Sequence, residues 1–68
     1  MEKMIHVRFS PDGSVVEIGE QPAGISPQDW FNYLTRTVGN TYQAFAGGRG
    51  IFRVASGDLD ALKGALAS

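Results

Sequence analysis

Apolar and polar side chains alternate over residues 4–9, which is the period of a half-buried β-strand. The apolar members are Ile5, Val7 and Phe9. Residues 10–13 read Ser-Pro-Asp-Gly, a composition typical of a tight turn, because proline presets φ and glycine accepts a left-handed conformation. A second apolar stretch follows at residues 15–18, so this part of the chain predicts a β-hairpin.

Two registers are open for this hairpin. A three-residue loop with a bulge at Gly13 sets Val7 opposite Glu17. A loop one residue longer gives the pairs Phe9–Val16, Val7–Ile18 and Arg8–Glu17. The second register separates apolar from charged residues better, and register follows that separation, so we expect the longer loop.

Several helix-start signals coincide at Ser26. Its side chain can cap a first turn, and Pro27 stands at the first helical position, where a missing N–H costs nothing. Asp29, three residues after Ser26, is placed to accept a hydrogen bond from the N-cap residue in return, and its negative charge complements the positive end of the helix dipole. Ile25 and Trp30 have the spacing of a hydrophobic staple.

The predicted helix spans residues 27–38 and is expected to end at Gly39 in a left-handed cap. Its apolar stripe consists of Trp30, Phe31, Leu34 and Val38. Residues 41–45 and 51–55 then predict two further strands, joined by the glycine-rich segment 46–50.

A second helix is expected after the last strand, with Ser56 or Asp58 as its cap. Its apolar stripe consists of Leu59, Leu62 and Leu66. Both helical stripes need an apolar sheet face. The order ββαββα therefore predicts an α+β fold, a four-stranded antiparallel sheet with two helices on one face, in a single domain over residues 1–68. The other face is expected to carry His6, Arg8, Glu17 and Arg53.

Composition narrows the classes of function. The 68 residues include no cysteine and one histidine, which excludes disulfides and thiolate metal sites. Six basic and seven acidic residues give a net charge of −1, whereas nucleic-acid-binding proteins normally carry a basic excess. No apolar run approaches the ~20 residues of a membrane span. We expect a cytoplasmic protein that does not interact with membranes.

Residues suited to catalysis are scarce. Only His6 could act as an imidazole base, and its position in a strand, on the outward side, is typical of a solvated side chain. The aspartates have local duties in turns or helix starts, namely Asp12, Asp29, Asp58 and Asp60. We therefore expect no enzymatic activity, no metal and no cofactor.

The segment Gly47–Gly50 leaves three interpretations open. It can be a hairpin that needs positive φ values, a tip that a partner orders, or an anion-binding nest of backbone N–H groups. The phosphate-loop pattern is absent, since that loop joins a strand to a helix and ends in Lys-Ser/Thr. Seven aromatic residues exceed what so small a core uses, so one or two should be exposed near this segment.

Exposed aromatic residues beside arginine are typical of protein interfaces. We expect a non-enzymatic binding protein that docks on a larger protein or assembly. Self-association of the protein is a related expectation. Modulators and inhibitors encoded by phages and prophages are one group of such proteins. The candidate partner-binding residues are Arg49, Phe45, Arg53, Tyr42, Tyr33, Arg8 and Gly48. The alternative is a single-stranded nucleic-acid-binding module that uses the arginine and aromatic residues of the second hairpin. Residues 49–54 are similar to the base-stacking strand of RNA-recognition sheets, although Ile51 replaces an aromatic residue there.

Overall fold

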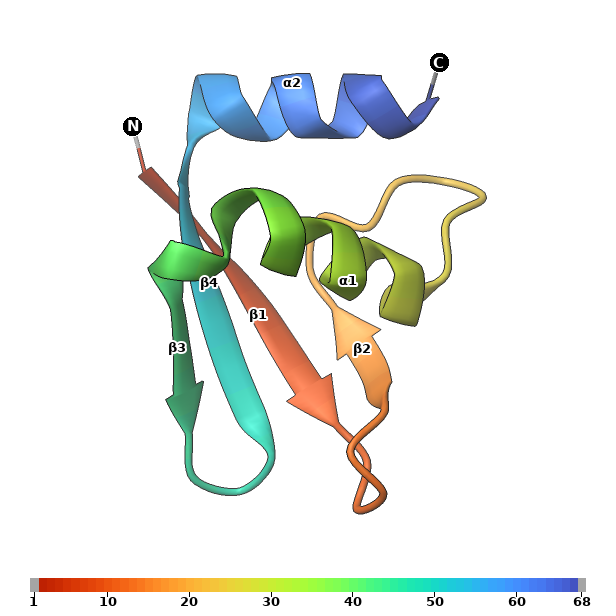
Figure 1. Cartoon of the computed structure of the whole chain (residues 1–68), viewed down its shortest axis with the longest axis vertical. Helices are drawn as coiled ribbons and strands as arrows, with labels where there is room; N and C mark the ends of the chain where they lie inside the picture. The colour runs from red at the N-terminus through yellow and green to blue at the C-terminus, as the bar shows by residue number, and fades with distance from the viewer. Residues whose placement is uncertain (1, 68) are drawn as a thin grey trace.

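The computed structural model describes residues 2–67 and confirms the predicted ββαββα order (Figure 1). The strands are β1 (Glu2–Phe9), β2 (Val15–Ile18), β3 (Tyr42–Phe45) and β4 (Arg49–Ala55). The helices are α1 (Pro27–Val38) and α2 (Ser56–Ala67), and a short 3₁₀ turn, η1 (Gly39–Thr41), follows α1. The strands form one antiparallel sheet in the order β2-β1-β4-β3, and both helices pack on the same face of it.

The β1–β2 pairing confirms two of the three predicted pairs and corrects the third. The confirmed pairs are Val7–Ile18 and Arg8–Glu17. Phe9 pairs with Val15 and not with Val16, because a β-bulge makes Val16 an extra residue between successive pairs. The bulge keeps Val15 in the core, whereas Val16 is half-exposed.

Helix α1 begins and ends where the sequence predicts. The hydroxyl oxygen of Ser26 accepts a hydrogen bond from the backbone N–H of Asp29 at 3.1 Å, and Pro27 occupies the first turn. Ile25 is partly buried against the core, as a staple residue should be. Local capping chemistry therefore sets the entry into this helix.

The predicted left-handed cap at Gly39 is wrong. Gly39 has φ −60° and ψ −24°, which is right-handed helical geometry, and the chain continues into η1. The N–H of Tyr42 donates to the Gly39 carbonyl, and the Thr41 hydroxyl donates to the Val38 carbonyl at 2.8 Å. These bonds satisfy carbonyl groups at the helix end without a left-handed residue, and β3 consequently begins at Tyr42.

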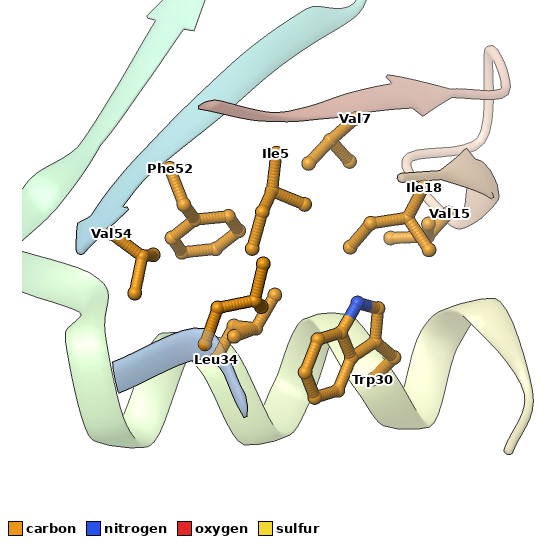
Figure 2. Packing of buried hydrophobic residues seen from close by; sticks show 9 residues of the cluster. Ile5, Val7, Val15, Ile18, Trp30, Leu34, Phe52 and Val54 are labelled. Carbon is orange, nitrogen blue, oxygen red and sulfur yellow. The ribbon is translucent and has the colours of Figure 1, made fainter. Parts of the chain in front are cut away.

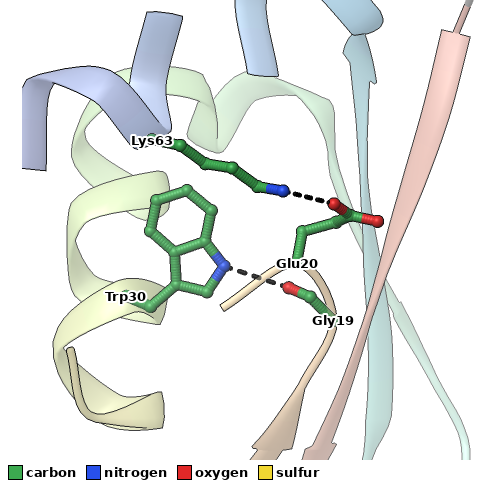
Figure 3. Close-up of polar contacts among 4 residues, drawn as sticks. All are labelled: Gly19, Glu20, Trp30 and Lys63. Carbon is green, nitrogen blue, oxygen red and sulfur yellow. Dashed lines mark hydrogen bonds and ion pairs between the residues drawn. The ribbon is translucent and has the colours of Figure 1, made fainter. Parts of the chain in front are cut away.

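The core lies between the sheet and the helices (Figure 2). Its buried residues are Ile5, Val7, Val15, Ile18, Trp30, Leu34, Phe52, Val54 and Leu59. Trp30 is fully buried, and its indole N–H donates to the Gly19 carbonyl at 3.0 Å, so its polar atom is satisfied (Figure 3). The Lys63 ammonium group forms an ion pair with the Glu20 carboxylate at 2.5 Å, which links α2 to the loop after β2 (Figure 3).

The two central strands, β1 and β4, begin earlier than the sequence predicts. β1 begins at Glu2, two residues earlier than expected, and β4 begins at Arg49. The longer β4 shortens the glycine-rich connection to a three-residue turn at residues 46–48. Helix α2 starts at Ser56, directly after β4, and of its apolar stripe Leu59 is fully in the core while Leu62 and Leu66 pack against it.

Candidate functional site

The face of the sheet opposite the helices, here called the open face, carries most of the candidate residues. Successive side chains of a strand point to opposite faces, so the residues that alternate with the core residues lie there. They include Met4, His6 and Arg8 of β1, Glu17 of β2, Gln43 and Phe45 of β3, and Arg49, Ile51 and Arg53 of β4. The sequence prediction of His6, Arg8, Glu17 and Arg53 on this face is confirmed by the register.

One row of the open face crosses all four strands at the end of the sheet nearest the hairpin turns. Arg8 is the direct cross-strand partner of both Glu17 and Arg49, and Arg49 is also the partner of Phe45. The row therefore reads Glu17, Arg8, Arg49, Phe45 from β2 to β3. Two of the predicted arginines and the predicted phenylalanine are brought together here.

The β3–β4 turn holds Arg49 in that row. Gly47 and Gly48 have φ values of +83° and +73°, so the segment forms the hairpin turn with positive φ values that the sequence predicts as one interpretation. The Gly48 carbonyl accepts a hydrogen bond from the Phe9 N–H at 2.7 Å. A Cβ atom at Gly48 would lie 3.3 Å from the Phe9 carbonyl oxygen. Gly48 is thus a positioning residue, which fastens the turn to the end of β1 beside Arg8.

A shallow hollow of about 560 Å³ lies on the open face at this row. Its lining residues are His6, Val7, Arg8, Glu17, Phe45, Ala46, Arg49 and Gly50. The Val7 side chain points into the core and Gly50 has none, so these two residues contribute backbone to the floor. The walls are therefore two arginines, one aromatic ring, a histidine and a carboxylate.

The arginines of the open face have no ionic partners within the sheet. Among residues 2–67, the side-chain ion pair within 4.0 Å is Lys63–Glu20, on the helix side. Arg8 stands opposite Glu17 without forming an ion pair, and Arg49 has Arg8 and Phe45 as its lateral neighbours. The guanidinium groups are exposed and available to an external anion.

Ile51 is a buried residue of this face to which the sequence analysis gave no role. It is 4% exposed although it lies on the side without helices. Its lateral partners are His6 and Gln43, and Arg49 and Arg53 lie two positions away along β4. The sequence signal for this role was an apolar residue at a strand position where the alternation otherwise places polar side chains. Such a residue indicates that the open face has an apolar centre, which long polar side chains cover.

Two of the predicted site residues lie elsewhere. Tyr42 packs on the helix side with its ring 4.9 Å from that of Phe52, and desolvation there raises the pKa of its phenol. Tyr33 stacks on Trp30 with the ring centroids 6.0 Å apart. The alternation within β3 already puts Tyr42 and Phe45 on opposite faces, a signal that the sequence contained.

Phe45 is the aromatic residue of the open face, and it is 45% exposed. The remaining six aromatic side chains belong to the core or pack against it. The expectation of an exposed aromatic residue near the glycine-rich turn is therefore confirmed. Exposed apolar surface on this face also includes Met4, which is 53% exposed and pairs laterally with Arg53.

In residues 2–67, no three His, Asp or Glu side chains gather in a way that could hold a metal ion. No helix of the described chain has the length and apolar character that crossing a bilayer requires. Searches of protein-family models, of curated proteins and of solved structures find no match to this chain. Inference about function therefore starts from the open face itself.

Proposed function

We propose that this protein is a non-enzymatic binding protein that docks on a larger protein through the open face of its sheet. The observation that supports the proposal is the combination of exposed Phe45 and Met4 with arginines that form no ion pair in the described chain. Aromatic residues, methionine and arginine are enriched in protein interfaces relative to the rest of the surface. Phe45 and the adjacent Arg49 are the natural anchors.

The distribution of charge supports the same face. Three of the six basic residues lie on it, namely Arg8, Arg49 and Arg53. Two of the seven acidic residues, Glu2 and Glu17, share it. The open face is thus locally positive on a chain whose net charge is −1, which favours a partner with an acidic surface.

The same geometry gives less support to the alternative function, binding of single-stranded nucleic acid. Modules of that kind stack successive bases on several aromatic side chains in a basic groove. Here Phe45 stands on the open face without Tyr42, whose ring packs under α1 against Phe31 and Phe52. The arginines alone would supply phosphate contacts without a stacking platform.

The experiment is affinity capture from a lysate of the native host with the tagged wild-type protein and matched arginine variants. Arg49→Glu changes the open face, and Arg36→Glu changes an exposed arginine of α1 on the other side of the molecule. We expect the wild type and Arg36→Glu to retain the same protein, and Arg49→Glu to lose it, with all three equally folded by circular dichroism.

Nuclease treatment and salt decide between the partner classes. A protein partner should survive nuclease treatment, and its retention should fall only in part between about 50 and 500 mM salt, because salt screens the arginine–carboxylate contacts but not the apolar contacts. Phosphate contacts would make retention fall steeply over that range. Equal retention by Arg49→Glu and the wild type would show that the open face is not the docking surface.

A further inference from the structure

Arg8 and Arg49 are direct cross-strand partners on the open face, in a ladder that runs along nearly all of β1. Side chains in that relation have Cβ atoms about 4.5–5.5 Å apart, and like charges placed so are destabilising. Folding alone gains nothing from two guanidinium groups in adjacent positions. The arrangement points to a ligand that brings the missing negative charge.

No carboxylate of the described sheet compensates Arg49. Its lateral neighbours are Arg8 and Phe45, and Ile51 follows it on the same face. Glu17 stands beyond Arg8, one strand farther away, and forms no ion pair with it. Positive charge is therefore concentrated between β1 and β4, with an aromatic ring on the β3 side.

Resting on the proposed docking through the open face, we propose that the Arg8–Arg49 pair binds a side-chain carboxylate of an acidic segment of the partner protein. Phe45 then contacts an apolar residue next to that carboxylate. A guanidinium group donates two parallel N–H bonds to a carboxylate, which gives geometric specificity as well as energy. The hollow of about 560 Å³ has the size of sites that take small ligands, so a glutamate and a neighbouring side chain fit in it.

The backbone presents this site in a fixed form. The β1–β4 ladder sets the spacing of the arginines, and the bond from the Phe9 N–H to the Gly48 carbonyl fixes the turn before Arg49. A preorganised site loses less free energy on binding than a mobile one. The proposal therefore needs no rearrangement of the sheet.

The negative charge of Glu17 in this row of the sheet favours a ligand with a single carboxylate over a ligand with several consecutive phosphates. Glu17 lines the same hollow, so a chain with one negative charge at each step would meet repulsion at the β2 end. A single carboxylate placed between Arg8 and Arg49 avoids that position. A nucleic-acid backbone is thus the alternative that the experiment must separate.

The test is an NMR titration of the ¹⁵N-labelled protein, observing backbone amides and the arginine side-chain Nε–H groups. The ligand is a blocked pentapeptide of glycine, glutamate, phenylalanine, glutamate and glycine. Its control has glutamine in place of each glutamate. We expect the glutamate peptide to shift Arg8, Arg49 and Phe45 and to bind at least about fivefold more tightly than the glutamine peptide.

Variants and a third ligand complete the test. Arg49→Gln should weaken the glutamate peptide about fivefold, and Arg36→Gln should leave its affinity unchanged. Equal affinity of the two peptides would overturn the carboxylate site while leaving docking on the open face intact. If neither peptide shifted any resonance, the carboxylate site would also be overturned. Docking through the open face would still be tested independently by the capture experiment with the lysate. If a thymidine dodecanucleotide bound the same residues more tightly than the glutamate peptide, the site would bind phosphate and the carboxylate proposal would be overturned.

Discussion

The ring of Tyr42 lies over Gly50, in the space that a side chain at position 50 would occupy. A Cβ atom built on Gly50 would be 2.7 Å from two carbon atoms of that ring. Gly50 is also the cross-strand partner of Val7 in the centre of the sheet. The glycine is therefore required by the packing of an aromatic residue on the helix side, and its φ value is not the reason.

Gly50→Ala should destabilise the protein by about 1–3 kcal/mol, the usual cost of overpacking. Urea unfolding followed by tryptophan fluorescence measures the change. The matched control is Gly64→Ala in α2, where the added Cβ meets nothing within 4 Å and better helix propensity should stabilise by up to about 1 kcal/mol. If Gly50→Ala cost the same in a Tyr42→Val background, the ring would not be the obstacle.

Trp30→Ala should leave the chain largely unfolded. Truncation of a fully buried large aromatic residue costs about 3–5 kcal/mol, as much as a core of this size supplies. Far-ultraviolet circular dichroism at 25 °C distinguishes the outcomes. Trp30→Phe keeps most of the packing and loses the bond to the Gly19 carbonyl, so it should cost less and remain folded. A cooperative native-like transition in Trp30→Ala would contradict the assigned core.

Arg49→Glu should stabilise the isolated protein by about 0.2–1 kcal/mol while abolishing partner binding. The substitution replaces a like-charge pair with Arg8 by an opposite-charge pair in the same cross-strand position. Thermal unfolding at low and high salt measures the effect, which should shrink as salt screens it. Arg36→Glu on α1 controls for the change in net charge. Clear destabilisation by Arg49→Glu would mean that Arg49 has a structural role.

Asp12 should make the first hairpin sensitive to acid. Hydrogen bonds from the Ser10 hydroxyl, and then from the hydroxyl and N–H of Ser14, lower the pKa of Asp12 from 3.8 to about 2. A group whose folded pKa is depressed contributes stability above its unfolded pKa and loses that contribution as pH falls to the folded value.

The contribution of Asp12 should accordingly be complete above about pH 5, fall as the pH drops through 4 and 2, and be gone near about pH 1. Asp12→Asn should therefore lower the urea midpoint at pH 5 and approach the wild type as the pH falls below 2. Asp60→Asn, at an exposed position of α2, controls for the loss of a negative charge. Parallel curves for Asp12→Asn and the wild type across this window would show that the turn does not depend on the carboxylate.

The sequence predicts the local elements well because their signals act over a few residues. Ser26 and Pro27 mark the start of α1, and the alternation in β1 assigns each side chain to a face. Errors arise where the decision depends on distant packing. The residues around Val16 carry no sequence signal for a β-bulge. The right-handed conformation of Gly39 follows from the short helix η1, which connects α1 to Tyr42 at the start of β3.

The candidate site divides in the same way. Alternation alone placed Arg8 and Arg53 on the face without helices, since that property needs only strand parity. Which strands become neighbours is decided by burial of both helical stripes on a single sheet, a long-range outcome. The β1–β4 pairing therefore belongs to the tertiary structure, and it sets Arg8 beside Arg49. The β3–β4 pairing, in which Tyr42 stands opposite the core residue Phe52, puts Tyr42 on the helix side.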